Sequence, residues 1–300
     1  MRTIARVDCH HHLWDVERFD YPWLKPGADR PRAIFPDLTD IAGNYRITDY
    51  LADARGANIV KSVHVDGGYV PTDPVGETRY LQSVADRHGF PHGIVARAAL
   101  NAADIQPILE RQCRFGNIRG VRHILNWHAD AGKRFTDRKD WMHDPAWLKG
   151  FALLARYGLS FDMQIYPAQM TEAALLARRF PDVPIILNHA GMPLPGEPED
   201  ARMWREGMRR LAACANVSVK ISGLGMTIPQ WTAALIRPWV LETIDLFTPQ
   251  RAMFASNFPV DKLYGGFTDL YAAYDEITAG FSDDEALAMF YANAVRVYRL

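Results

Sequence analysis

Short apolar runs recur along the chain, separated by longer stretches in which apolar residues follow a helical period. Short runs rich in Val, Ile and Ala are typical of buried parallel strands, and the alternation with amphipathic stretches indicates β/α units. The eight expected strands cover residues 4–9, 60–65, 94–99, 119–124, 159–164, 184–189, 217–222 and 252–256. The expected helices cover residues 75–88, 105–115, 145–157, 171–180, 201–213, 236–247 and 268–279.

Eight expected strands that alternate with amphipathic stretches within 300 residues predict an α/β protein, a single (β/α)8 TIM barrel domain over residues 1–300. A doubly wound open sheet is the alternative, and it is disfavoured because no G-x-G-x-x-G follows the first strand. Residues 13–48 are too long for an ordinary strand-to-helix connection and contain Trp14, Phe19, Tyr21 and Trp23. This long aromatic-rich insertion is either a lid over the active site or a segment packed permanently on the barrel rim.

Charge and composition exclude several classes of partner. The 34 basic and 35 acidic side chains give a net charge of −1, without the cationic excess that binding a phosphate backbone requires, so no nucleic acid is expected. Three cysteines are too few for a disulfide framework, which indicates a reducing compartment. The sequence shows neither a signal peptide nor a run of about 18 uncharged residues, so we expect a cytoplasmic protein without membrane contact.

Polar side chains gather at the carboxyl ends of the expected strands, which in a barrel face the active site. His10 and His12 lie two residues apart at the end of the first strand, so they project to the same side and can share one divalent ion or one substrate. His189 ends the sixth strand and is expected at the same mouth. The other strands contribute His64, Asp66, Arg122, His123, Asp162, Gln164, Lys220, Ser222 and Asn257.

The motifs at these strand ends resemble those of the amidohydrolase-related (amidohydrolase 2) family. They are D-x-H-x-H at the first strand, G-V-R-H at the fourth, F-D-x-Q at the fifth, N-H-x-G-x-P at the sixth, K-x-S-G-L at the seventh and M-F-x-S-N-F-P-V-D at the eighth. The order and number of these motifs make the resemblance specific to the family but not to a substrate. The chain is most similar to the branch with L-fuconolactonase-like and 2-pyrone-4,6-dicarboxylate lactonase-like enzymes.

The resemblance implies a (β/α)8 hydrolase that opens cyclic esters, with His10, His12 and His189 at the centre of the mouth and a strand-eight acid that activates water. Asn257 stands where many relatives have that acid, and an amide cannot accept a proton as a carboxylate does. The candidates for the missing general base are Asp66 as first choice, then Asp162, His189 and His123. Asp261 follows Asn257 by four residues on an expected loop, where a surface role is expected.

The same substitution leaves two alternatives open for a metal cofactor. If a metal is bound, the resemblance implies one divalent ion, such as zinc, on His10, His12 and His189. Lactonases of this branch also include enzymes thought to work without a metal, so a metal-independent hydrolase is the second alternative.

Basic side chains at the strand ends indicate the chemistry of the substrate. The residues Arg97, Arg122, Arg134, Arg138, Lys139, Lys220 and Lys262 all follow or occupy carboxyl-terminal halves of strands. If these charges gather at the mouth, they suit a carboxylated or oxygen-rich lactone, or the hydroxy acid formed from it. The alternative is that Arg134, Arg138 and Lys139 form a solvated loop face. Arg122, Gln164 and Lys220 are expected to contact this small molecule, with Trp14 or Trp127 stacked on its ring.

Two other functions fit parts of this pattern. A metal-dependent decarboxylase of the same superfamily also uses an H-x-H pair, although such enzymes usually keep the strand-eight aspartate that is Asn257 here. A degenerate barrel that only binds a ligand is the third candidate.

Overall fold

A computed structural model describes residues 3–70, 73–196 and 198–300 of the chain. Eight parallel strands pair in sequence order from β1 to β8, which confirms the predicted TIM barrel. The strands are β1 Arg6–His11, β2 Ile59–Val65, β3 Gly93–Arg97, β4 Ile118–Arg122, β5 Ser160–Met163, β6 Ile185–Leu187, β7 Val217–Ile221 and β8 Ala252–Phe254. Each expected apolar run therefore forms one strand, and most strand residues are buried, except at the start of β2 and at single positions in β3, β4 and β7.

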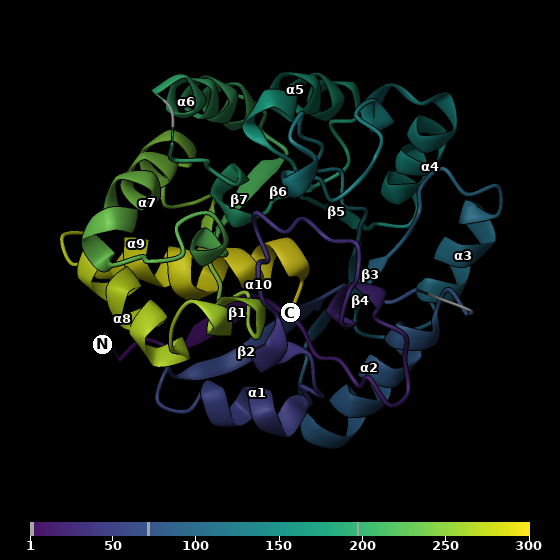
Figure 1. The fold of residues 1–300 in the computed structure, drawn as a ribbon, viewed down its shortest axis with the longest axis horizontal. Coiled ribbons are helices and arrows are strands. Elements are labelled where there is room, and N and C mark those ends of the chain that lie inside the picture. Colours follow the sequence, from purple (N-terminus) through teal and green to yellow (C-terminus); the bar gives the residue numbers. More distant parts are fainter. Residues whose placement is uncertain (1–2, 71–72, 197) are drawn as a thin grey trace.

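An outer layer of helices surrounds the strands (Figure 1). It comprises α1 Ile47–Asp53, α2 Gly76–His88, α3 Ile105–Gln112, α4 Pro145–Arg156, α5 Met170–Arg179, α6 Pro198–Ala212, α7 Ala233–Phe247 and α8 Phe267–Ile277. All seven expected helices are confirmed, with ends that shift by a few residues, whereas the short helix α1 was not predicted. No helix in the described ranges is long and apolar enough to cross a membrane.

The junction between β1 and β8 depends on a buried carboxylate. Asp8 accepts hydrogen bonds from the backbone N–H and hydroxyl of Ser256, at 2.8 and 2.6 Å, and from the Tyr50 hydroxyl at 3.0 Å. Burial raises the pKa of Asp8 to about 6 despite these bonds. Beyond the strand ends the backbone N–H of Asn257 bonds to the carbonyl of His10 at 2.7 Å. These bonds therefore join β1 to the chain after β8 at the end of the barrel where the candidate site residues lie.

The C-terminal segment closes the end of the barrel at which the strands begin. It consists of α9 Asp283–Leu287, a π-helical turn Ala288–Ala292 and α10 Asn293–Tyr298. In Figure 1 the yellow helix α10 lies inside the ring of outer helices, close to β1. Tyr298 is fully buried and belongs to a core cluster with Val7, Cys9 and Val63 of the strands. This plug was not predicted from the sequence.

The aromatic insertion after β1 is part of the packed core. Trp14, Tyr21, Leu24 and Phe35 are at most 5% exposed. Trp14 donates a hydrogen bond to the Gly43 carbonyl at 2.8 Å, and its backbone pairs with Tyr45. This burial corresponds to the second of the two alternatives, a segment packed on the rim, rather than to a lid that opens freely.

Candidate active site

A cavity of about 440 Å³ lies at the carboxyl ends of the strands, under the insertion. The strand ends and the loops that follow them contribute His12, Arg97, Arg122, Gln164, His189 and Asn257 to its wall. The insertion contributes Trp23, Arg30 and Phe35. The cavity is therefore a concave site with apolar walls and a few convergent polar groups, which is the usual form of a small-molecule site.

His12 presents an unprotonated ring nitrogen to this cavity. Its Nδ1 lies 2.7 Å from the backbone carbonyl of Val65, which only accepts hydrogen bonds. Burial, together with Arg122, lowers the pKa of His12 to about 3, so the ring is neutral and carries its single proton on Nδ1. Nε2 consequently carries a lone pair, and it lies 3.4 Å from Oδ1 of Asn257.

His189 is held in an unusual backbone conformation beside the cavity. Its φ angle is +57°, and the next residue, Ala190, is also left-handed at +48°. Its Nδ1 lies 3.0 Å from the Ser222 hydroxyl, and a side chain at Gly223 would overlap the imidazole ring. Burial and the charges of Arg122 and Lys220 hold the pKa of His189 well below its usual value. Non-glycine residues in this region of φ/ψ space cluster at functional sites.

His10 lies beneath the other two histidines and does not line the cavity. Its ring centroid is 5.1 Å from that of His12 and 4.6 Å from that of His189, so the structure brings the three predicted histidines together. The ammonium of Lys220 lies 3.4 Å from His10 Nδ1. Because an ammonium only donates, the proton of the neutral His10 ring is on Nε2, and that buried atom has no hydrogen-bond partner among the described residues.

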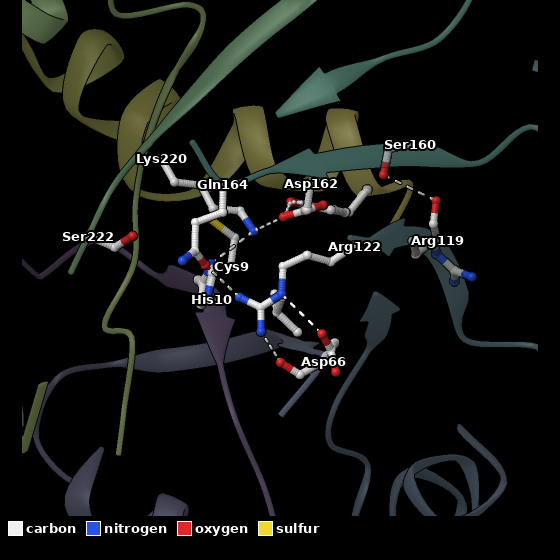
Figure 2. A network of polar contacts seen from close by, with 12 residues as sticks. Cys9, His10, Asp66, Arg119, Arg122, Ser160, Asp162, Gln164, Lys220 and Ser222 are labelled. Carbon is white, nitrogen blue, oxygen red and sulfur yellow. Dashed lines mark hydrogen bonds and ion pairs between the residues drawn. The ribbon is translucent and has the colours of Figure 1, made fainter. Parts of the chain in front are cut away.

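Arg122 is the best-anchored cation of the cavity (Figure 2). Its Nη1 donates to Oε1 of Gln164 at 3.1 Å, Nε lies 3.4 Å from the Asp66 carboxylate, and Nη2 donates to the Asp66 carbonyl. Burial raises the pKa of Asp66, but Arg122, Arg97 and the N–H of Gly68 more than offset that effect, and the pKa lies below its ordinary value. Asp66 is 2% exposed and does not line the cavity.

Asp162 and Lys220 form a second polar layer below the cavity. Their side chains make an ion pair at 0% exposure, and the Tyr298 hydroxyl donates to the Asp162 carboxylate at 2.9 and 3.1 Å. Figure 2 shows the Lys220 amino group directed to Asp162, with His10 close by. Neither residue lines the cavity.

Three further predicted residues lie away from the cavity wall. Nδ1 of His123 accepts a hydrogen bond from Nε1 of Trp147 at 3.0 Å. Trp14 is fully buried behind His12, at 6.2 Å between ring centroids. Trp127 lies beneath the guanidinium of Arg134, which is 5.3 Å from its ring centroid. Their side chains therefore support the loops around the site.

Asp261 corrects the expectation of a surface residue, because it is only 3% exposed. The chain after Asn257 turns into a short 3-10 helix, Val260–Leu263, which carries Asp261 back toward the strand end. Its carboxylate accepts a hydrogen bond from Nδ2 of Asn257 at 3.0 Å. The spacing of four residues was the only sequence signal for this contact, since a single helical turn brings such positions together.

A barrel with a histidine-rich cavity at the carboxyl ends of its strands is typical of (β/α)8 enzymes. A family model for amidohydrolases matches residues 7–300, and the chain belongs to this family. The resemblance inferred from the strand-end motifs is thereby confirmed.

Known relatives extend over nearly the whole chain. It is 49% identical over 100% of both chains to the uncharacterized protein y4mH of Sinorhizobium fredii. It is 29% identical to an L-fucono-1,5-lactonase of Burkholderia ambifaria, across 98% of this chain and 96% of that protein. A crystal structure of an amidohydrolase from Burkholderia multivorans with bound zinc has a TM-score of 0.82 at 24% identity, covering 99% of this chain and 100% of that one.

The histidines of this chain do not fit a mononuclear zinc site. The Lys220 ammonium directs a proton onto His10 Nε2, which removes the lone pair that a metal ligand needs. Asn257 stands where the family resemblance implies a strand-eight carboxylate. The charges that act on His10 include those of the cations Lys220 and Arg122, which disfavour a metal ion beside it. Within the described ranges no three His, Cys, Asp or Glu side chains are placed to hold one ion.

Proposed function

We propose that this protein is a hydrolase that opens a small cyclic ester by water attack within the cavity. The observation that carries the proposal is the pair formed by a neutral histidine, His12, with a free lone pair and an anchored guanidinium, Arg122, on one cavity wall. The L-fucono-1,5-lactonase among the relatives supports the same reaction class.

Arg122 supplies the electrostatic part of this reaction. The lactone carbonyl oxygen accepts a hydrogen bond from its guanidinium, which is held in place by Gln164 and Asp66. Negative charge develops on that oxygen when water adds to the carbonyl carbon, and the fixed, buried cation of Arg122 stabilises it. The donor is preorganised, so the side chain does not need to move during the step.

His12 accepts the proton of the attacking water at Nε2. Its low pKa keeps this nitrogen unprotonated in the free protein, and the oxyanion that forms nearby raises the pKa in the intermediate. When the tetrahedral intermediate collapses, the ring C–O bond breaks, and the leaving alkoxide takes the proton from His12. The product is a hydroxy acid, which balances the addition of one water.

Asp66, the first choice for the base from sequence alone, takes a positioning role in this scheme. Its carboxylate and its carbonyl both face Arg122, and unlike His12 the residue does not line the cavity, so its oxygens are not presented to a water bound there. Asp162 is likewise engaged by Lys220 and Tyr298 below the cavity. Neither of them then serves as the general base.

The substrate class that this cavity favours is a lactone carrying a carboxylate or several oxygens. Arg97 lines the cavity, and none of the carboxylates in the described residues is within ion-pair distance of it. The guanidinium groups of Arg30 and Arg134 donate to the carbonyls of Phe35 and His128, and within the described ranges neither has a carboxylate at ion-pair distance. Against the arginines, the cavity wall has only two exposed carboxylates, Asp29 and Asp137. Guanidinium groups match carboxylates in bidentate geometry.

A panel of sugar lactones and carboxylated lactones, followed with a pH indicator, tests this function. We expect release of one proton per ring opened, with the carboxylated compounds preferred. The rates should be unchanged after treatment with a chelator, in protein that elemental analysis shows to be free of metal. Release of carbon dioxide from aromatic acids would instead identify a decarboxylase. Binding of hydroxy acids without turnover of any lactone would identify a binding protein.

A further inference from the structure

Asn257 and Asp261, at the carboxyl end of β8, form a buried polar pair next to the cavity. Asn257 lines the cavity, whereas Asp261 lies behind it at 3% exposure. Asn257 has a φ angle of +58°, in the left-handed region. Its backbone N–H bonds to the His10 carbonyl, and its own carbonyl accepts the N–H of Asp261. The pair is therefore fixed to both β1 and the turn after β8.

The hydrogen bonds of this pair determine which way the Asn257 amide points. Burial raises the pKa of Asp261 to about 7, and in its ionised form, which prevails above that pH, the carboxylate has no proton to donate. Asp261 then accepts from the Asn257 NH₂ group at 3.0 Å. The amide oxygen of Asn257 consequently points in the other direction, toward His12 Nε2 at 3.4 Å. An amide without a partner behind it has no such preference, since its two ends differ little in size.

Two acceptors thus face each other across the edge of the cavity. His12 gives its only proton to Val65, and Asn257 gives its NH₂ group to Asp261. Neither His12 Nε2 nor Asn257 Oδ1 therefore carries a proton that it could donate to the other atom. A molecule with two hydrogens, such as water, satisfies both lone pairs at once and keeps its own lone pair for attack.

No cation explains the burial of Asp261. Among the described residues it has no salt bridge, and its hydrogen-bond donors are the Asn257 amide and the backbone N–H of Gly223. Burial, together with the charge of Asp261, raises the pKa of the neighbouring Tyr264 and Tyr274. A buried carboxylate with so few partners is costly to keep, which argues for a role beyond stability.

We propose that Asp261 is a positioning residue that orients the Asn257 amide, so that Asn257 Oδ1 and His12 Nε2 together accept the two hydrogens of the attacking water. The inference rests on the proposed hydrolytic function. It also gives a role to Asn257 at the strand-eight position, because the Asp261 carboxylate, four residues further along the chain, acts through the amide.

Two substitutions of Asp261 test the role of its acceptor oxygen. Asp261→Leu removes the acceptor and frees the amide to rotate, and we expect kcat to fall by about 10²-fold with KM little changed. Asp261→Asn keeps one acceptor oxygen without the charge, and we expect a loss of less than about tenfold. Equal losses in the two variants, or no loss in either, would overturn the proposal.

Exchange of the two side chains provides a check that does not depend on whether Asp261→Leu folds. Asn257→Asp alone places two carboxylates against each other and should lower kcat, whereas Asn257→Asp combined with Asp261→Asn restores one amide and one carboxylate. We expect the double variant to be at least about tenfold more active than the product of the single effects. Additive effects would contradict a pair that acts as a unit.

A readout independent of lactone turnover separates this inference from the proposed function. With ¹⁵N-labelled asparagine, the Asn257 NH₂ signal should be protected from exchange in the wild-type protein and in Asp261→Asn, but not in Asp261→Leu. Protection in the absence of any lactonase activity would refute the function and leave the amide orientation standing. Lactonase activity with an unprotected Asn257 amide would refute the orientation alone.

Discussion

Two polar layers lie one above the other inside this barrel, and they differ in what their side chains leave free. In the upper layer His12, Arg122 and Asn257 each keep a donor or acceptor directed into the cavity. In the lower layer the charges of Asp162 and Lys220 are paired with each other, and Tyr298 closes the layer from below. Polar residues at alternate strand positions therefore do not mark an active site unless their depth is also known.

The largest effect is expected at His12, the group of the upper layer that takes the proton. His12→Asn should lower kcat/KM by about 10³-fold, because general-base catalysis is lost, while the melting temperature changes little. His123→Asn is the matched control, since His123 is a strand-end histidine outside the cavity wall, and it should stay within about tenfold of the wild type. Comparable losses of kcat/KM in both variants would contradict the distinction between a histidine that lines the cavity and one that does not.

The lower layer should respond in stability. Lys220→Met leaves the Asp162 carboxylate buried without its cation, and unfolding by denaturant should show a loss of about 3 kcal/mol or more. Removing both charges with Lys220→Met and Asp162→Leu should recover part of that loss. A Lys220→Met protein with wild-type stability would mean that this layer is not a structural support.

Glu77 lies between the upper layer and the insertion, and it predicts a pH-dependent stability. Burial and the nearby Asp66 raise the pKa of Glu77 to about 8, while the Tyr21 hydroxyl donates to it at 3.2 Å. A raised pKa means that this group contributes its stability below its unfolded pKa, near 4.5, and that the contribution is lost as the pH rises through 8.

Glu77→Gln keeps an acceptor for Tyr21 without the ionisation, so it should stabilise the protein more at pH 9 than at pH 6. A difference of at least about 1.4 kcal/mol, the equivalent of one pKa unit, is expected from thermal melts at the two pH values. A stability difference that does not vary with pH would show that Glu77 is already ionised at pH 6.

The smallest effect is expected for Asp66→Asn. The variant keeps the backbone carbonyl that binds Arg122 and loses only the carboxylate, so kcat/KM should fall by about tenfold. A loss of 10³-fold in steady-state kinetics, with His12→Asn still active, would identify Asp66 as the general base and reverse the roles of the two residues.

The sequence predicted all eight strands because each is a short apolar run between amphipathic stretches. It did not predict depth, because alternation shows which side chains face the axis but not how far along it they lie. Asp162, in β5, and Gln164, just beyond the end of that strand, lie two residues apart, yet only Gln164 lines the cavity. The sequence also did not predict that Tyr298 plugs the barrel or that Asp261 is buried. Both positions depend on where a later segment of the chain folds back.

A crystal structure with a carboxylated hydroxy acid, the product of the proposed reaction, tests the central claim most directly. The account predicts that the carboxylate formed by ring opening lies within hydrogen-bond distance of both Arg122 and His12, with Asn257 Oδ1 beside it. A product bound elsewhere, such as in the cavity between Arg46 and Tyr80 on the far side of the insertion, would contradict the account.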